Sequence, residues 1–464
     1  MLTTPQGTTT VTVNPATEAE IATYDRLSDD ALDAALGRAA DAFEVHRQRP
    51  IADRAEAMRQ LADLLDDQKD SLGRLMTDEM GKPLAQAVAE AEKCAWACRY
   101  YADHAAAFLA DEARETEAAR SFVAYEPLGP VLAIMPWNFP FWQAFRFAAP
   151  TVMAGGVGLL KHADAVLGCG DRMAALFAEA GFDDGVFQHV VIDHDQAADA
   201  IADDRVRAVT LTGSERAGRT VGKLAGAALK PSVLELGGSD AFVVLADADL
   251  DAAVETGVTA RVQNNGQSCI AAKRFILEAP IAEAFTRRFV ERMEALTVGD
   301  PTGDVDLGPL VSERARAGVH DQVERAAADG AEVLTGGAVP DGTGFYYPPT
   351  VLGNVREGTV AFDEEIFGPV ASLVVAADAD DAVRLANATP FGLGGSVWTR
   401  DTQRGERVAR AIRSGAVFIN EMTKSHPNLP FGGVGISGYG RELGREGIRA
   451  FVNAKAVWID EGEA

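Results

Sequence analysis

The segment from residue 131 to residue 228 alternates short apolar runs with longer helical patterns, and this alternation restricts the fold more than any other feature. The apolar runs, typical of strands, cover residues 131–135, 157–161, 186–192 and 206–211. The helical patterns between and after them cover residues 141–153, 164–180 and 214–228. Such an order predicts βαβ units, in which helices cover a parallel sheet.

A second series of the same kind follows Glu235. Its strands are expected near residues 242–245, 274–277, 370–375, 396–398 and 417–420. The chain has 464 residues, more than one hydrophobic core usually serves, so two or more domains are expected. The first third is mostly helical after two short strand-like pieces, with Ser28 as a helix N-cap and a long Ala-rich helix from Pro83 to about Leu109. Residues 121–125 and 451–459 look like isolated strands.

Charge narrows the classes of partner. There are 69 acidic and 43 basic residues, for a net charge of −26. Such a surface repels phosphate backbones and anionic headgroups, which disfavours nucleic-acid and membrane binding. Scarce lysine and acidic, Ala/Asp-rich helices favour a protein from a halophile, because salt screens the repulsion between carboxylates. An acidic protein from a mesophile is the alternative.

The four cysteines do not suggest a disulfide scaffold, and no pair has zinc-finger spacing, so no metal site is expected. No signal peptide is apparent at the N-terminus. Prolines and polar residues interrupt the apolar stretch of residues 131–160, which therefore cannot be a simple membrane span. These features together predict a cytoplasmic protein.

Cys269 is the first candidate for chemistry. It lies between a Gly/Asn-rich bend, residues 264–266, and a strand-like run, so backbone geometry would hold its thiol in place. A nucleophile needs thiolate character and a fixed direction of approach. The alternative for a lone cysteine is a small buried apolar residue.

Two further residues could assist a thiol. Asn138 lies between Pro136 and Pro140, which fix the backbone, and a rigid amide N–H could stabilise an oxyanion; an ordinary turn is the alternative. Glu235 lies in an apolar strand that ends in two glycines, where desolvation would raise its pKa towards that of a general base. Pairing of Glu235 with an arginine or a backbone group is the other possibility.

A dinucleotide site is indicated more weakly. The usual Gly-x-Gly-x-x-Gly sequence after a strand is missing. Instead Gly213 would permit a tight turn, and Ser214 would open a helix whose N-terminus can bind phosphate. Lys161, at the end of another strand, could reach a cofactor ribose or could be an ordinary solvated lysine.

Five motifs in this order resemble the NAD(P)-dependent aldehyde dehydrogenase superfamily over essentially the whole chain. They include residues 136–140, 234–238, 266–275, 365–369 and 430–433. Within that superfamily, residues 161–163, 266–275 and 437–443 look most like succinate-semialdehyde dehydrogenases.

The resemblance implies a role for each matching residue. Cys269 would be the nucleophile, Asn138 with the Cys269 backbone N–H the oxyanion hole, and Glu235 the base. Glu442 would be a proton relay or, equally, part of a structural salt bridge. Cofactor contacts are implied for Trp137, Lys161, Gly213, Ser214, Glu365 and Phe367, with Glu365 on the nicotinamide ribose and Phe367 against the nicotinamide.

The implied α/β fold has three parts. A Rossmann-like cofactor domain would comprise residues 1–113 and 129–234, a catalytic α/β domain residues 235–441, and a small β oligomerisation element residues 114–128 and 442–464. That element would build a homodimer or homotetramer.

Substrate choice is expected to depend on two arginines, Arg146 and Arg274, which match family positions that hold a distal carboxylate. A guanidinium pairs with a carboxylate through two hydrogen bonds and would select a semialdehyde acid. Structural arginines that bridge helices or acidic loops are the alternative. Ser425 is a third, weaker candidate contact.

Asp164 stands where NADP-preferring relatives often carry Ser or Thr. A carboxylate repels a 2′-phosphate and accepts ribose hydroxyls, which favours NAD over NADP. Gly435 replaces the lysine usual in Phe-Gly-Gly-x-Lys, and we attach no catalytic meaning to this. Ser268 and Ile270 flank Cys269, so the nucleophile has no disulfide partner in its own segment.

The expected activity is therefore oxidation of an aldehyde to an acid through a Cys269 thiohemiacetal and thioester, with succinate semialdehyde as the favoured substrate. Another semialdehyde, such as that of 2-oxoglutarate, is an alternative substrate. A CoA-acylating enzyme is disfavoured by the presence of Glu235. A non-catalytic structural protein with the same fold is the alternative from another class.

Overall fold

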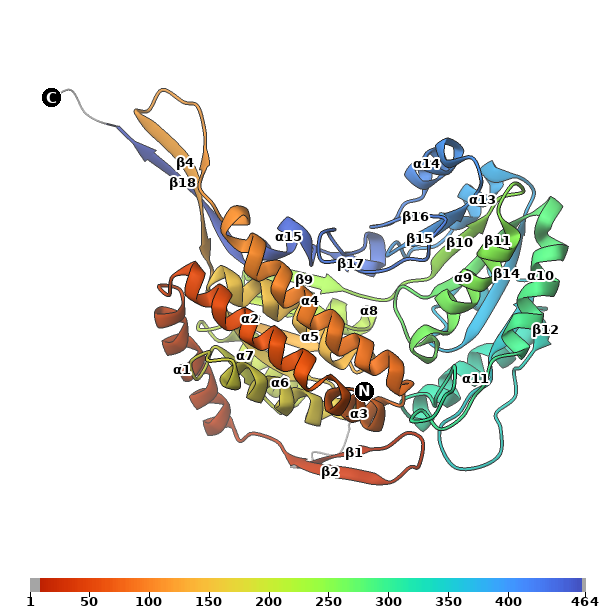
Figure 1. The fold of residues 1–464 in the computed structure, drawn as a ribbon, viewed down its shortest axis with the longest axis horizontal. Coiled ribbons are helices and arrows are strands. Elements are labelled where there is room, and N and C mark those ends of the chain that lie inside the picture. The colour runs from red at the N-terminus through yellow and green to blue at the C-terminus, as the bar shows by residue number, and fades with distance from the viewer. Residues whose placement is uncertain (1–8, 461–464) are drawn as a thin grey trace.

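Two parallel sheets, each packed against helices, form the two lobes of the molecule (Figure 1). The computed structural model describes residues 9–460. The first sheet has the strand order β17-β9-β8-β5-β6-β7, and only β17 runs antiparallel. Its strands are β5 (Pro130–Met135), β6 (Val157–His162), β7 (Phe187–His189), β8 (Ala208–Thr212), β9 (Ser232–Glu235) and β17 (Gly438–Tyr439). The four strands predicted from periodicity and the apolar strand around Glu235 are confirmed, whereas β17 was not predicted.

Helices from the first half of the chain pack against this sheet. They are α1 (Asp29–His46), α2 (Ile51–Asp67), α3 (Lys69–Met80), α4 (Leu84–Phe108), α5 (Pro140–Ala154), α6 (Leu167–Glu179), α7 (His194–Ala202) and α8 (Glu215–Ala227). Ser28 caps α1 by accepting a hydrogen bond from the Ala31 N–H, as predicted. The core helix α5 is buried along its whole length, which explains why its sequence is apolar on every side.

The second sheet has the order β12-β13-β14-β11-β10-β15-β16, and only the edge strand β12 is antiparallel. Its strands are β10 (Asp240–Val244), β11 (Ala272–Glu278), β12 (Glu332–Thr335), β13 (Thr350–Gly353), β14 (Val370–Ala376), β15 (Gly395–Trp398) and β16 (Phe418–Ile419). Side chains alternate between two separate cores, Val243 and Ile276 on one face, Phe242 and Phe275 on the other. Burial on both faces explains the continuous apolar runs of these strands.

Helices cover both faces of the second sheet. On one face lie α9 (Leu250–Val262) and α10 (Ala279–Glu294), and on the other α11 (Glu313–Ala328) and α13 (Ala379–Ala386). These two helix layers enclose the sheet, so any site on this lobe must lie at an end of the strands.

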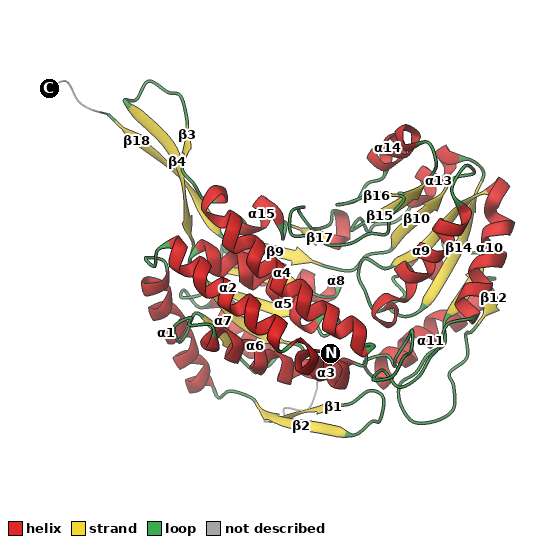
Figure 2. Ribbon diagram, viewed as in Figure 1, coloured by secondary structure: helices red, strands yellow, loops and turns green. Residues whose placement is uncertain are grey.

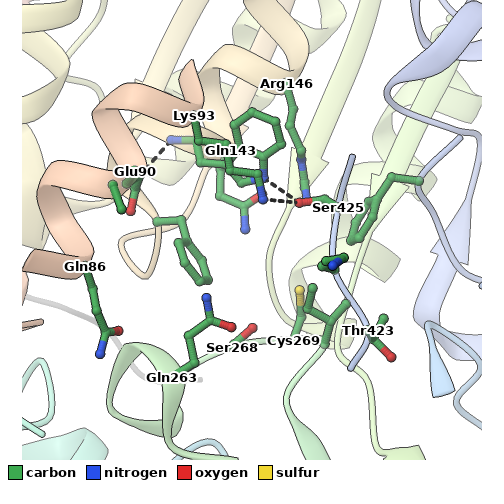
Figure 3. Close-up of a pocket in the computed structure, with 16 residues that line it drawn as sticks. Gln86, Glu90, Lys93, Gln143, Arg146, Gln263, Ser268, Cys269, Thr423 and Ser425 are labelled. Carbon is green, nitrogen blue, oxygen red and sulfur yellow. Dashed lines mark hydrogen bonds between the residues drawn. The ribbon is translucent and has the colours of Figure 1, made fainter. Parts of the chain in front are cut away.

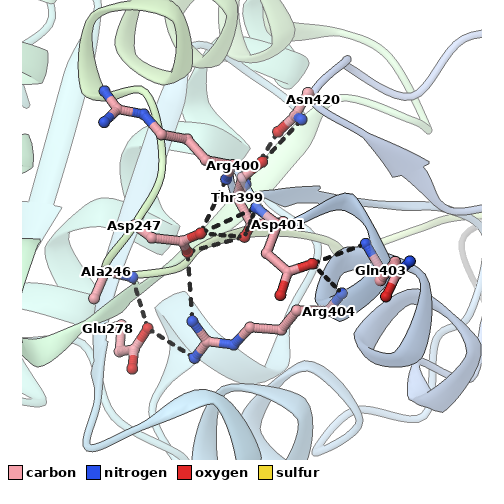
Figure 4. A network of polar contacts seen from close by, with 9 residues as sticks. All are labelled: Ala246, Asp247, Glu278, Thr399, Arg400, Asp401, Gln403, Arg404 and Asn420. Atoms are coloured by element: carbon pink, nitrogen blue, oxygen red, sulfur yellow. Dashed lines mark hydrogen bonds and ion pairs between the residues drawn. The ribbon is translucent and has the colours of Figure 1, made fainter.

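The carboxyl end of the second sheet is closed by a network of polar contacts (Figure 4). Asp247, just after β10, accepts hydrogen bonds from the Thr399 hydroxyl and from the N–H groups of Arg400 and Asp401. Arg404 of α14 (Thr402–Ala411) lies 3.4 Å from Asp247 and 3.5 Å from Glu278. The polar groups at this end bind one another.

A third, three-stranded sheet projects from the body, as Figure 2 shows. It consists of β3 (Glu112–Ala113), β4 (Arg120–Pro127) and β18 (Val452–Ile459), in the order β18-β4-β3. The two isolated strands expected from the sequence therefore pair with each other, antiparallel, along their whole length. A separate hairpin of β1 (Thr9–Val13) and β2 (Glu20–Asp25) lies beside the first lobe (Figure 1).

The α/β class and the three-part architecture are confirmed by this arrangement. The residue boundaries given above for the three parts stay a prediction, and their outermost residues, 1–8 and 461–464, lie outside the described range. Between residues 9 and 460, no helix is both long and apolar enough to cross a membrane.

Candidate active site

The candidate site lies where the two sheets meet end to end. β9 leaves the first sheet at Glu235 and β10 enters the second at Asp240, so only residues 236–239 join them. The carboxyl ends of β5, β6, β8 and β9 carry Asn138, Lys161, Gly213 and Glu235. The amino ends of β10, β11 and β14 are preceded by Gly238, Cys269 and Glu365.

The loop that presents Cys269 has an unusual backbone. Asn264, Asn265 and Gly266 have φ angles of 59°, 58° and 71°, a left-handed run that asparagine and glycine tolerate better than other residues. A Cβ on Gly266 would lie 2.5 Å from the carbonyl carbon of Gly368, so the loop packs directly against another backbone segment. The Asn/Gly bend in the sequence thus has a structural reason.

Lys273 of β11 holds the same loop in place. Its Nζ donates to the carbonyl oxygens of Ser268 at 2.7 Å and Cys269 at 2.6 Å, and lies 3.1 Å from Glu365 Oε1. Burial raises the pKa of the Cys269 thiol to about 11, while the positive charges of Arg146 and Lys273 act in the opposite direction. The thiol is therefore protonated at neutral pH and needs a base before it can attack.

Asn138 is buried beside this loop. The side-chain Nδ2 of Asn138 donates to the Gln267 backbone carbonyl at 3.0 Å, and the backbone carbonyl of Asn138 accepts from Asn264 Nδ2 at 2.7 Å. One amide N–H remains for another acceptor, since an amide nitrogen carries two. The flanking prolines and these bonds hold the amide in place, which is what oxyanion stabilisation requires.

Glu235 is buried, and neither carboxylate oxygen has a hydrogen-bond partner within the described residues. A Cβ on Gly432 would lie 2.6 Å from Glu235 Oε1, so this glycine makes room for the carboxylate. Burial, followed by the negative charge of Glu442, raises the pKa of Glu235 well above its usual value. A buried carboxyl group without a hydrogen-bond partner and with a raised pKa is a candidate general base.

Glu442 and Arg146 form a buried ion pair, with 2.6 Å between Arg146 Nε and Glu442 Oε2. The guanidinium also lies 4.3 Å from the centre of the Phe431 ring. The structural salt bridge that the sequence left open for Glu442 is thus present. Arg146, which was expected to bind substrate, therefore already has an acidic partner.

The glycine pair after Glu235 allows the two sheets to approach. A Cβ on Gly237 would lie 2.2 Å from Glu365 Oε2, and a Cβ on Gly238 would lie 2.7 Å from the Cys269 carbonyl. Glu365 also accepts a hydrogen bond from the Gly238 N–H at 3.1 Å. Side chains at these two positions would push apart the groups that the sequence predicted to act together.

A cavity of about 180 Å³ opens beside Cys269 (Figure 3). Its lining includes Arg146 and Ser425, as the sequence predicted, together with Lys93, Gln143 and Gln263, which it did not. Lys93 and Gln143 belong to the helices α4 and α5, whose patterns indicated only core packing. Glu235 is not among the lining residues and lies behind the cavity, near Gly432 and Glu442.

Comparison with known proteins identifies the family. The pattern of the aldehyde dehydrogenase family matches residues 2–457. The chain belongs to the aldehyde dehydrogenase family.

Several relatives carry the name succinate-semialdehyde dehydrogenase [NADP(+)]. The one from Mycobacterium tuberculosis is 54% identical over 97% of this chain and 99% of that protein. A probable enzyme of this name from Synechocystis is 51% identical over 97% of this chain and 99% of its own length. The crystal structure of succinic semialdehyde dehydrogenase from Streptococcus pyogenes, in complex with NADP+, superposes with a TM-score of 0.96 at 35% identity, over 97% of this chain and 100% of that one.

Arg274 does not face the cavity of this aldehyde dehydrogenase. Its guanidinium donates to the carbonyl oxygens of Ser239, Leu385 and Ala386, and it is almost fully buried. Neighbouring residues of a strand point to opposite faces. Lys273 points towards the loop that presents Cys269, so Arg274 points away from it. These bonds favour the structural alternative for Arg274 over the expected contact with substrate.

The residues expected at the cofactor gather at the carboxyl edge of the first sheet. Trp137 and Phe367 meet edge to face at 5.8 Å between ring centres. Ser214 caps α8 by accepting from the Ala217 N–H, so the first turn of that helix faces the same edge. Gly213 does not have a positive φ angle, and a Cβ added to it would meet no atom closer than 3.7 Å, so the turn does not require glycine.

Lys161 lies 3.7 Å from Asp164, and Arg26, not predicted from the sequence, lies 3.9 Å from the same carboxylate. Two cations therefore flank the residue on which the preference for NAD was based. Both relatives described above are named for NADP+. NAD(P) dependence is supported, whereas the preference for NAD is not favoured.

Metal ligands are not gathered in the described part of the chain: no group of three or more His, Cys, Asp or Glu side chains could hold an ion there.

Proposed function

We propose that this aldehyde dehydrogenase oxidises succinate semialdehyde to succinate, with NADP+ as the hydride acceptor. The observation that carries the proposal is a thiol, Cys269, at the wall of a small cavity that also exposes cationic side chains. About 180 Å³ is below the roughly 300–1,000 Å³ typical of pockets for drug-sized ligands, which favours a short substrate. The names of the relatives agree with this choice.

The residues divide the reaction into two stages. Cys269 gives its proton to solvent and its sulfur attacks the aldehyde carbon, while the carbonyl electrons move to oxygen and form a thiohemiacetal oxyanion. Asn138 and the Cys269 backbone N–H donate hydrogen bonds to this oxyanion. Collapse of the oxyanion expels hydride from carbon and leaves a thioester on Cys269.

Hydrolysis then releases the acid. Glu235 accepts a proton from water as the water oxygen attacks the thioester carbon, and the Cys269 thiolate leaves. Burial raises the pKa of Glu235, which makes its carboxylate a stronger base towards water than an exposed glutamate would be. Glu442 and Arg146 keep the negative charge around Glu235 balanced.

The residues at the carboxyl edge of the first sheet fit a dinucleotide. The first turn of α8, with the Ser214 hydroxyl and the open space at Gly213, would hold phosphate, and Lys161 and Glu365 would hold the two riboses. Trp137 and Phe367 would bound the nicotinamide end. When bound, the cofactor supplies the acceptor for hydride.

We propose NADP+ because Arg26 and Lys161 both lie close to Asp164 and offset its negative charge. Replacement of Arg26 by Ala is expected to lower kcat/KM with NADP more than with NAD. The variant Asp164→Ser should raise kcat/KM with NADP. Equal changes with the two cofactors would exclude these residues from cofactor choice.

One assay tests the proposed activity. Purified enzyme is mixed with succinate semialdehyde and NADP+, and absorbance of the reduced cofactor is recorded alongside NAD+ and other semialdehydes. Cys269→Ala should abolish the signal, whereas Cys98→Ala, a buried thiol of α4, should retain it. No reduced cofactor with either dinucleotide would reject the proposal, and a higher kcat/KM for another semialdehyde would reassign the substrate.

We also propose a homodimer or homotetramer built through β18. Within the described range, β18 pairs on one side only, with β4, and leaves its other edge open, beside the half-exposed Trp458. An open edge can accept a strand from a second copy. Light scattering of the protein should give a multiple of 49.0 kDa.

Salt adaptation and a cytoplasmic location rest on composition. The net charge of −26 predicts that activity and thermal stability rise with salt, since screening reduces repulsion between carboxylates. An activity that declines steadily from low salt would exclude adaptation to a halophile. All four cysteines are free thiols, as in a reducing compartment.

A further inference from the structure

Lys93 lies in the wall of the cavity, opposite the loop that presents Cys269 (Figure 3). It is half-buried on α4, and its Nζ lies 2.9 Å from the Ser425 hydroxyl and 4.4 Å from the centre of the Trp142 ring. These contacts hold an ammonium group in place inside the cavity beside Cys269. The sequence had not indicated Lys93 as part of this site. Lysine side chains are seldom buried unless their charge is paired.

The charge of Lys93 is not neutralised by an acid. Among residues 9–460, it forms no ion pair. The nearest candidate on its own helix, Glu90, is engaged elsewhere: one oxygen accepts from the N–H groups of Phe141 and Trp142, and the other pairs with Lys82. Lys82 is thus a buried lysine with an acid partner, and Lys93 a neighbouring lysine without one.

Arg146 is also a cation, so it cannot supply the missing negative charge and instead adds to the positive charge around Lys93. Its Nε faces Glu442, so this pair is close to neutral, but the guanidinium still lies near Lys93. Burial, and then the charge of Arg146, lower the pKa of Lys93 to about 8. An anion that entered the cavity would stabilise the charged form and remove part of the cost of burial.

Ser425 completes a donor pair. Its oxygen already accepts two hydrogen bonds, from Lys93 Nζ at 2.9 Å and from Trp142 Nε1 at 3.0 Å. A hydroxyl oxygen accepts at two lone pairs and donates one hydrogen, so the Ser425 hydrogen is left to point to another acceptor. Trp142 and Lys93 therefore orient Ser425 as a donor.

We propose that Lys93, with Ser425, binds the distal carboxylate of the substrate and is the residue that selects a semialdehyde acid over an uncharged aldehyde. The proposal rests on the proposed oxidation of succinate semialdehyde and names the group that recognises it. An ammonium and a hydroxyl can each donate to one carboxylate oxygen, and hydrogen bonds to charged groups are the stronger kind. Lys93 takes the role that the sequence assigned to Arg274.

The test compares two aldehydes of equal carbon number, succinate semialdehyde and butanal, in wild type and Lys93→Met. Methionine keeps the apolar stem and removes the charge. We expect kcat/KM for succinate semialdehyde to fall about 100-fold, mainly through KM, and kcat/KM for butanal to stay within about threefold. Lys93→Arg should recover part of the lost kcat/KM, because it restores a cation.

Lys69→Met is the matched control. Lys69 forms an ion pair with Glu92 on the outer surface, so this variant changes net charge equally without touching the cavity. Its kcat/KM should equal that of wild type with both aldehydes. Thermal unfolding of each variant shows whether it is folded.

The outcomes separate the two proposals. If wild type reduces no cofactor with succinate semialdehyde, the proposed function fails. If wild type is active and Lys93→Met keeps its preference for succinate semialdehyde over butanal, the role of Lys93 is overturned. Equal losses with both aldehydes would likewise overturn it, since a structural defect does not distinguish a carboxylate from a methyl group.

Discussion

The two sheets of this aldehyde dehydrogenase bring opposite ends to the same site. The first sheet offers the carboxyl ends of its strands, with Asn138 and Glu235, as open α/β sheets usually do. The second offers its amino ends, with Cys269 and Glu365. Its own carboxyl end is filled by the Asp247 network, whose polar groups are bound to one another (Figure 4).

The connection between β9 and β10 explains the difference. The chain leaves the carboxyl end of one sheet and, after residues 236–239, enters the amino end of the next. A joint this short allows only these two ends to face each other. In the proposed reaction, the first sheet supplies the residues for proton transfer and cofactor binding, and the second supplies the nucleophile.

The largest effect that would test this division is expected at the carboxyl end of the first sheet. Glu235→Gln should lower steady-state kcat about 1,000-fold, because the thioester would lack its base. A single burst of reduced cofactor, one per Cys269, should remain in stopped-flow absorbance. Glu255→Gln, which removes an exposed carboxylate of α9, should keep kcat; full turnover by Glu235→Gln would remove Glu235 from hydrolysis.

A change at the joint should have the next largest effect. Gly238→Ala places a Cβ against the Cys269 carbonyl, where the backbone must shift, and we expect kcat to fall about 100-fold. The matched control is Gly226→Ala in α8, since no heavy atom lies within 4 Å of the added Cβ. Steady-state kinetics of both variants decide the matter, and equal activities would show that the approach of the two sheets tolerates a methyl group.

Thiol chemistry at the amino end of the second sheet should depend on pH. Because the pKa of Cys269 is about 11, the free enzyme at pH 7 holds mostly thiol. Alkylation by iodoacetamide should therefore accelerate about tenfold per pH unit between pH 7 and pH 10. Mass spectrometry of the Cys269 peptide measures the rate, and a plateau reached by pH 8 would show a thiolate stabilised in the free enzyme.

The smallest effect on turnover is expected at the carboxyl end of the second sheet. Asp247→Asn weakens the bonds to Thr399 and the loop after it, which should lower the free energy of unfolding by about 1–3 kcal/mol. Steady-state kcat should change less than about twofold, because the network has no contact with the cavity. A loss of kcat comparable to that of Gly238→Ala would show that the carboxyl end of this sheet also contributes to turnover.

Local pattern was sufficient for much of the fold and part of the site. Apolar runs that alternate with helical patterns identified four strands of the first sheet and most strands of the second. These strands are recognisable because strands buried on both faces are continuously apolar. The short strand β17 was not recognised, since its partner β9 lies far earlier in the chain. The association of Asn138 with the Cys269 loop was implied by the resemblance to aldehyde dehydrogenases, and the Asn138–Gln267 hydrogen bond joins them.

The sequence by itself determined the α/β architecture, because this depends on residue type and on spacing along the chain, and its ordered motifs led to the predicted chemistry of Cys269 through their resemblance to aldehyde dehydrogenases. Only the tertiary structure decided which cations face the substrate. Arg274 turns away because its strand neighbour Lys273 turns inward, and Lys93 becomes a binding group because Ser425, 332 residues later, meets it across the cavity. A side chain's neighbours across space set its charge and direction, and no local pattern contains them.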